Sequence, residues 1–198
     1  MLRTKNLALV LMGVALASVP AFSQEFNRSE VSVQAFGSFV KTTTDNGINQ
    51  TATNSGGVLA NYRFFFSPSH GIEVNYGYSL NTQTYGLESG PLGVKSDQHE
   101  VSAAYVFRHK MHGFTPFAEA GAGALVFDPR DIAGVSTQTR AAFVYGAGAD
   151  IDITNKFFVR AEYRGFVYQS PTYGLLEFQG ADRITHRAEP SVGFGYRF

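Results

Sequence analysis

Eight segments of this sequence alternate apolar and polar residues at every second position. The segment 71–80, GIEVNYGYSL, carries aliphatic and aromatic side chains at its even positions and polar residues or glycine at most of the others. A period of two is that of a β-strand, in which successive side chains point to opposite faces. The eight segments are 31–40, 57–66, 71–80, 99–107, 116–126, 142–151, 157–168 and 184–198.

The connections between these segments alternate in length. Short links at 67–70, 109–113 and 153–156 interleave with long ones at 41–56, 81–97, 127–139 and 169–183. Each segment is close to the 9 to 11 residues of a tilted transmembrane strand. The sequence therefore predicts an all-β fold, an eight-stranded antiparallel up-and-down transmembrane β-barrel with short periplasmic turns and longer extracellular loops.

A soluble β-sandwich or lipocalin-like barrel is the competing fold, because periodicity alone does not decide which face lies inside. Such a fold buries its apolar face and leaves its charges in water. Three features favour the membrane: the aromatic bias of the apolar face towards strand ends, the alternating loop lengths and the aromatic Phe198 at the end of the last segment.

The first residues have the pattern of a secretory signal peptide. A basic start at Arg3 and Lys5 precedes an apolar run from Leu7 to Ala17, and small residues at Ala21 and Ser23 suit cleavage before residue 24. The apolar run is shorter than the roughly 20 residues of a spanning helix. We expect residues 1–23 to be the signal peptide, cleaved near Ser23, and residues 24–198 to form one barrel domain.

Composition narrows the class of exported protein. The chain has no cysteine, so it has neither a disulfide framework nor a cysteine to carry lipid. Its formal net charge is 0, which disfavours a nucleic-acid partner. Only 16% of residues are charged, while 18 Phe, 10 Tyr and 21 Gly favour β structure with tight turns.

Charged residues recur on the polar faces of the predicted strands. The interior of an eight-stranded barrel is just wide enough for side chains to fill, and isolated ions there would cost several kcal/mol each unless paired. We therefore expect a lumen closed by paired charges; an ion pathway is the alternative. The expected lumen residues are Arg63, Glu73, Glu100, Glu119, Asp150, Arg160, Glu162, Arg164, Glu189 and Arg197.

Some pairings within this set are predicted by spacing. Arg63 and Glu73 flank the short link 67–70 at comparable distances, so they should be cross-strand neighbours. The run 160–164 should form a charge ladder along one strand. Arg108 and Arg187 are expected at the margins of the lumen.

The motifs that could indicate cofactor binding, metal binding or catalysis lack the structural context that these functions require. The GAG triplets at 121–123 and 146–148 lie within predicted strands, whereas nucleotide-binding glycines need a strand-to-helix turn. His109 and His112 lack an evident third ligand. His99 and Ser102 fall on opposite strand faces, which disfavours a lipid A-modifying enzyme. We expect no catalytic residue, no cofactor and no metal site.

Several segments resemble the eight-stranded outer-membrane β-barrel family of the OmpA N-terminal domain and OmpX type. They are GIEVNYGYS, FTPFAEAGAGA, YGAGADIDITNKFFVRAEYRGF and VGFGYRF. The resemblance implies the outer membrane of a Gram-negative-type cell, with membrane lipid, the insertion machinery and periplasmic chaperones as partners. It also implies that Phe194, Tyr196 and Phe198 form the assembly signal. Unlike larger family members, the chain is expected to lack a peptidoglycan-binding domain after the barrel.

The expected function is that of a small, monomeric, non-enzymatic barrel whose activity lies in its extracellular loops. Loop 41–56 is rich in Thr and Asn and should be solvated; loop 169–183 carries Tyr173, Leu175, Leu176 and Phe178. These loops could bind an extracellular ligand that the sequence does not identify. Narrow-channel transport of ions or small solutes is the alternative.

Overall fold

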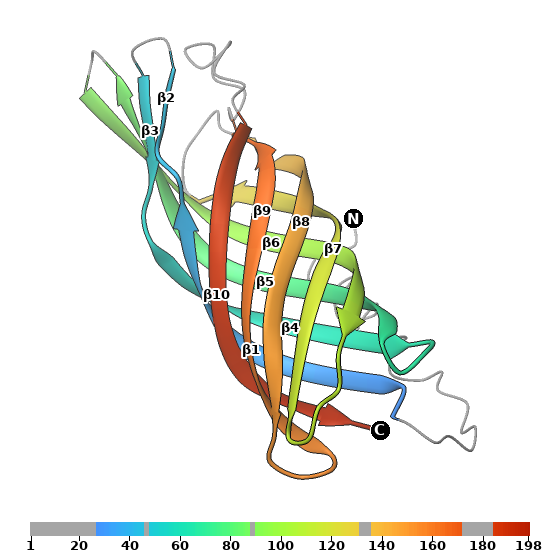
Figure 1. Cartoon of the computed structure of the whole chain (residues 1–198). Helices are drawn as coiled ribbons and strands as arrows, with labels where there is room; N and C mark the ends of the chain where they lie inside the picture. Colours follow the sequence, from blue (N-terminus) through green and yellow to red (C-terminus); the bar gives the residue numbers. More distant parts are fainter. Residues whose placement is uncertain (1–26, 46–47, 88–89, 131–135, 172–183) are drawn as a thin grey trace, which may run out of the picture.

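The computed structural model describes residues 27–45, 48–87, 90–130, 136–171 and 184–198 (Figure 1). Among these residues, no helix is long and apolar enough to cross a membrane. The described strands are β1 Ser29–Val40, β2 Thr43–Asp45, β3 Ile48–Ala52, β4 Ser55–Phe65, β5 His70–Leu87, β6 Gly90–Arg108, β7 Phe114–Pro129, β8 Gln138–Asp152, β9 Phe157–Gln169 and β10 Ile184–Arg197.

Eight of these strands close into a barrel. The order is β1-β4-β5-β6-β7-β8-β9-β10, every neighbouring pair is antiparallel, and β10 returns to β1. The closing register runs from Glu30 opposite Arg197 to Val40 opposite Arg187. Because closure pairs the first and last strands, the barrel has no free sheet edge. The predicted eight-stranded up-and-down fold is confirmed.

The two ends of the barrel differ. At one end, which we call the turn end, short turns join β4 to β5, β6 to β7 and β8 to β9, and β1 begins and β10 ends there (Figure 1). Thr154 stabilises one of these turns by accepting hydrogen bonds from the backbone N–H of Lys156 and Phe157 at 3.2 and 2.9 Å. Gly113 adopts a φ of 74° in another turn, where glycine has no steric penalty. We call the opposite end the loop end.

Two long connections predicted as loops are partly strands. Residues 41–56 include β2 and β3, and β3 pairs with β5 from Asn49 opposite Gly86 to Ala52 opposite Gln83. Within the predicted loop 81–97, β5 continues to Leu87 and β6 begins at Gly90, and the two strands pair as far as Leu87 opposite Gly90. Once the barrel has aligned β5 and β6, each further residue pair extends the same hydrogen-bond ladder. Strands β2 and β3 and the outer parts of β5 and β6 project beyond the barrel rim (Figure 1).

The barrel carries its apolar side chains on the outside. Phe194 is 70% exposed and Ile72 is 51% exposed, whereas Arg160 and Glu73 inside the barrel are 0% exposed. Aromatic rings gather near the turn end of the outer face, where Tyr196 contacts the rings of Phe157 at 5.0 Å and Phe198 at 6.0 Å between centroids. An apolar exterior with aromatic ends suits lipid, not water. This orientation excludes the soluble-barrel alternative.

Candidate functional site

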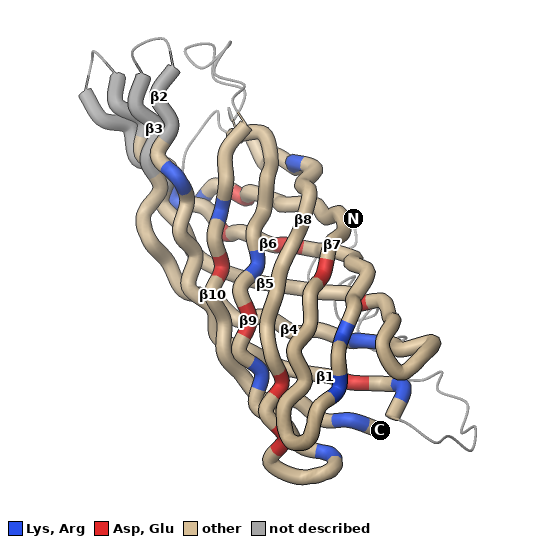
Figure 2. Tube along the Cα trace, viewed as in Figure 1, with Lys and Arg blue, Asp and Glu red and all other residues tan. Residues whose placement is uncertain are grey.

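The charged lumen is the candidate functional site. Each of the ten charged residues expected there is buried inside the barrel. Figure 2 shows that charged residues of both signs are distributed along the barrel strands. Arg187, expected at the margin, is also buried, at 1% exposure, because the strand pairing carries it to the inner face of β10. Glu30 lies in the lumen at 0% exposure and was missed. The alternation of the sequence could have predicted this position. Glu30 lies one residue before the predicted strand and falls on the same face as Ser32 and Gln34.

A turn-end cluster surrounds Glu30 and Arg160. Arg160 donates to both carboxylate oxygens of Asp150 at 2.7 and 2.9 Å and to Glu30 at 3.1 Å. Glu30 also accepts from Arg108 at 2.5 Å and from Arg197 at 3.0 Å, while Arg197 donates to Asp152. Three arginines therefore face three carboxylates. The turn-end cluster consists of Glu30, Arg108, Asp150, Asp152, Arg160 and Arg197.

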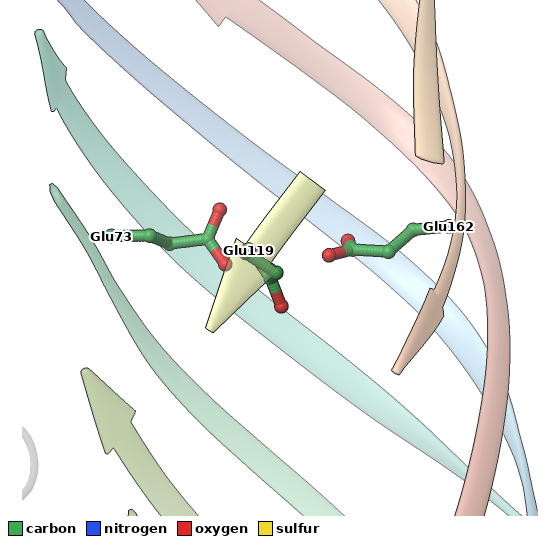
Figure 3. Close-up of side chains that lie close together, drawn as sticks. All are labelled: Glu73, Glu119 and Glu162. Carbon is green, nitrogen blue, oxygen red and sulfur yellow. The ribbon is translucent and has the colours of Figure 1, made fainter. Parts of the chain in front are cut away.

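A middle cluster contains three glutamates from β5, β7 and β9, whose carboxyl groups point toward one another (Figure 3). Their shared partner is Arg63 on β4. Arg63 donates to Glu73, its direct cross-strand neighbour as the turn spacing predicts. It also donates to Glu119 at 3.3 Å and to Glu162 at 3.5 Å. Glu162 accepts a further hydrogen bond from Gln34 at 3.1 Å.

A loop-end cluster pairs two arginines with two glutamates. Arg164 donates to Glu100 at 2.5 Å and to Glu189 at 2.8 Å. Arg187 donates to Glu100, lies 2.5 Å from Glu189 and donates to Gln98 at 3.1 Å. Each charge has two partners of opposite sign, so this cluster is neutral.

The expected row of charges along the inner face of β9 is present, but its members do not pair with one another. Arg160, Glu162 and Arg164 follow one another on β9 but pair with other strands: Arg160 with β8, Glu162 with β4 and Arg164 with β6 and β10. Side chains two residues apart on one strand project in parallel about 6.5 Å from each other. Direct cross-strand neighbours are closer, as for Arg160 with Asp150 and Arg164 with Glu189. The barrel is also narrow enough for long side chains to reach β4 and β6 across the lumen.

Inward aromatic rings complete the lumen. The guanidinium carbon of Arg108 lies 3.4 Å from the centroid of Phe65, and that of Arg63 lies 3.8 Å from the centroid of Phe117. Arg197 covers Phe158 at 4.4 Å. Such cation–π contacts stabilise a guanidinium out of bulk water. These inward rings were not predicted, although Phe158 has the same parity as Arg160 on β9 and therefore shares its face.

The histidine and serine positions considered for catalysis lie on different faces. His99 faces outward and hydrogen bonds through Nδ1 to the Tyr76 hydroxyl at 2.8 Å, whereas Ser102 is buried in the lumen. The β-strand wall separates the two side chains. His186 likewise contacts an outward hydroxyl, that of Tyr145, at 2.8 Å. His109 and His112 are exposed in the β6–β7 turn.

A closed antiparallel barrel with an apolar outer face and a buried, ion-paired interior is a transmembrane β-barrel. The chain belongs to the family of the outer membrane protein beta-barrel domain, whose model matches residues 8–198. Membership places the protein in the outer membrane of a Gram-negative-type cell.

Solved structures share the fold. Ail, the attachment invasion locus protein of Yersinia pestis, in complex with the heparin analogue sucrose octasulfate, is 20% identical with a TM-score of 0.54, over 87% of this chain and 99% of that chain. OprG from Pseudomonas aeruginosa is 14% identical with a TM-score of 0.60, over 87% and 96%. Neisserial surface protein A is also 14% identical with a TM-score of 0.60, over 86% and 97%. A search of curated protein sequences finds no match.

Proposed function

We propose that the protein is a non-enzymatic outer-membrane barrel whose lumen is closed by paired charges and whose activity lies at the loop end. The observation that carries the proposal is the stack of three charged clusters across the lumen. Arg63, Arg160, Arg164 and Arg187 are each at most 1% exposed, and each has a carboxylate partner. Ions could cross only if such pairs separated.

Electrical recording tests the closed lumen. Purified wild-type protein in a planar lipid bilayer is expected to show no steady ion conductance, because side chains fill the path and are held by ion pairs. A known porin prepared in the same detergent is the positive control, and detergent alone is the blank. A steady, reproducible single-channel current would contradict the plug and favour the narrow-channel alternative.

The loop end carries an extension on which we propose that a surface-binding site lies. Strands β2 and β3 and the outer halves of β5 and β6 form a sheet beyond the rim (Figure 1). Ail, which has this fold, has been solved in complex with a ligand, the heparin analogue sucrose octasulfate. A variant lacking residues 82–95 separates the two parts of the proposal. It should retain a stable barrel and lose any surface binding that a ligand screen detects with wild type.

We also propose that the aromatic side chains of β10 are recognised during assembly, after removal of residues 1–23. Phe194 and Phe198 face outward at 70% and 40% exposure, where a partner can reach them. Phe198→Ala should lower the amount of barrel in the outer-membrane fraction severalfold, measured by immunoblotting. Phe39→Ala, which removes another outward phenylalanine at 45% exposure, is the matched control. Equal membrane levels of the two variants would contradict the signal.

A further inference from the structure

The middle cluster differs from its two neighbours in charge. The turn-end cluster sets three arginines against three carboxylates, and the loop-end cluster sets two against two. In the middle cluster, Arg63 alone faces Glu73, Glu119 and Glu162, so three carboxylates minus one guanidinium leave two negative charges. Arg160 also lies 3.7 Å from Glu73, but it hydrogen bonds to Asp150 and Glu30, and its charge is therefore counted in the turn-end cluster. An uncompensated buried charge is strongly destabilising.

Unpartnered atoms lie in the same cluster. Glu73 and Glu119 have fully buried side chains, and both use only Oε2 toward Arg63. Among the residues that the structure describes, Oε1 of each has no hydrogen-bond partner. Asn75, which follows Glu73 on the inner face of β5, is 1% exposed, and neither polar atom of its amide has a partner within the described part of the chain. Buried polar groups are normally satisfied, so the two carboxylate oxygens, which lack a donor in a cluster short of positive charge, point to a missing positive ligand.

The geometry of the three carboxylates suits a cation. One oxygen of each glutamate lies within 4.8 Å of the other two. Three points so spaced all lie within about 2.8 Å of a common centre, slightly beyond the 2.3–2.6 Å of calcium–oxygen bonds. Small side-chain rotations would therefore bring all three carboxylates to calcium–oxygen bonding distance, and bidentate carboxylates and water would supply the remaining ligands of the six to eight that calcium takes. Magnesium, at 2.0–2.1 Å with strict octahedral geometry, would need a larger contraction, and zinc favours nitrogen and sulfur ligands.

We propose that Glu73, Glu119 and Glu162 bind one calcium ion in the middle of the lumen. The ion supplies the positive charge that Arg63 alone does not, and it ties β5, β7 and β9 together across the barrel. Glu73 and Glu119 each keep one oxygen, Oε1, that makes no contact with Arg63. The site does not depend on the surface role, so a failure of either proposal leaves the other testable.

The experiment measures bound metal and stability in the same samples. The mature chain is refolded in detergent with calcium chloride or with EDTA, free ion is removed by gel filtration, and calcium is counted by mass spectrometry of the elements. Refolding lets the ion enter before the barrel closes. Wild type should hold one calcium per barrel and unfold at a higher temperature than the EDTA sample. Magnesium chloride in place of calcium should give a smaller increase in the unfolding temperature.

Two isosteric variants locate the ion. Glu119→Gln should weaken calcium binding by at least about tenfold because the site loses a charged ligand. Glu189→Gln, in the loop-end cluster, should keep it. Glu162→Gln replaces Glu119→Gln if the latter does not fold. Wild type without bound calcium, or equal losses in Glu119→Gln and Glu189→Gln, would overturn the site. So would a Glu119→Gln barrel that is more stable than wild type in EDTA and unchanged by calcium, because a proton then neutralises the cluster.

Discussion

Arg160→Met is expected to lower the free energy of unfolding by about 3 to 5 kcal/mol, the usual result of removing one partner from a buried ion pair. Arg160 is 0% exposed and donates to both Asp150 oxygens, to Glu30 and to Asn61. Methionine keeps an unbranched side chain, although a shorter one, and has no charge and no hydrogen-bond donor. It therefore leaves Asp150 and Glu30 buried with fewer positive partners. Urea unfolding in lipid vesicles, followed by far-ultraviolet circular dichroism, measures the change.

Arg130→Gln is the control for this prediction. Arg130 also pairs with an aspartate, Asp97, at 2.6 Å, but its side chain is 42% exposed. Water and salt screen such a pair, so its loss should change stability little. Similar decreases in the free energy of unfolding for Arg160→Met and Arg130→Gln would show that a buried lumen ion pair stabilises the barrel no more than an exposed one. That result would contradict the proposal that the lumen ion pairs are a main source of barrel stability.

Gly193→Ala is expected to impair closure of the barrel. Gly193 lies on β10 opposite Gln34 of β1, at the seam where the first and last strands meet. A Cβ at this position would overlap the carbonyl oxygen of Val33 and lie 2.5 Å from Cα of Gln34. Both atoms belong to backbone, so relief requires the two strands to move apart. Overpacking of this kind typically costs about 1 to 3 kcal/mol, and here it acts on the pairing that closes the barrel.

The folded fraction reports this effect directly. Folded and unfolded barrel are separated by gel electrophoresis without heating, and unfolding in urea gives the stability of the fraction that folds. Gly56→Ala is the control, because its Cβ would meet only the carbonyl oxygen of Phe36 at an ordinary 3.6 Å. A Gly193→Ala barrel that folds as completely as Gly56→Ala, with wild-type stability, would contradict the steric argument.

Local pattern predicted some contacts of the lumen but not others. The pairing of Arg63 with Glu73 was predictable, because a short turn determines which residues of two adjacent strands lie opposite each other. The partners of Glu162 were not, because Arg63 and Gln34 come from β4 and β1, far from β9 in the sequence. Glu30 was missed for a simpler reason: the predicted strand began at residue 31, two residues after the start of β1 at Ser29. The long connections were read as loops because their composition is polar, yet pairing with β5 makes strands of residues 48–52.

The sequence by itself determined which residues share a face, since a period of two is a property of each extended segment alone. It also determined the number of barrel strands and the ends at which they turn. Only the tertiary structure decided which face lies inside, because alternation is the same for an inverted barrel. Closure also decided that Glu73, Glu119 and Glu162 meet around Arg63 (Figure 3). Their convergence depends on the tilt and stagger of all eight strands, which no single segment encodes.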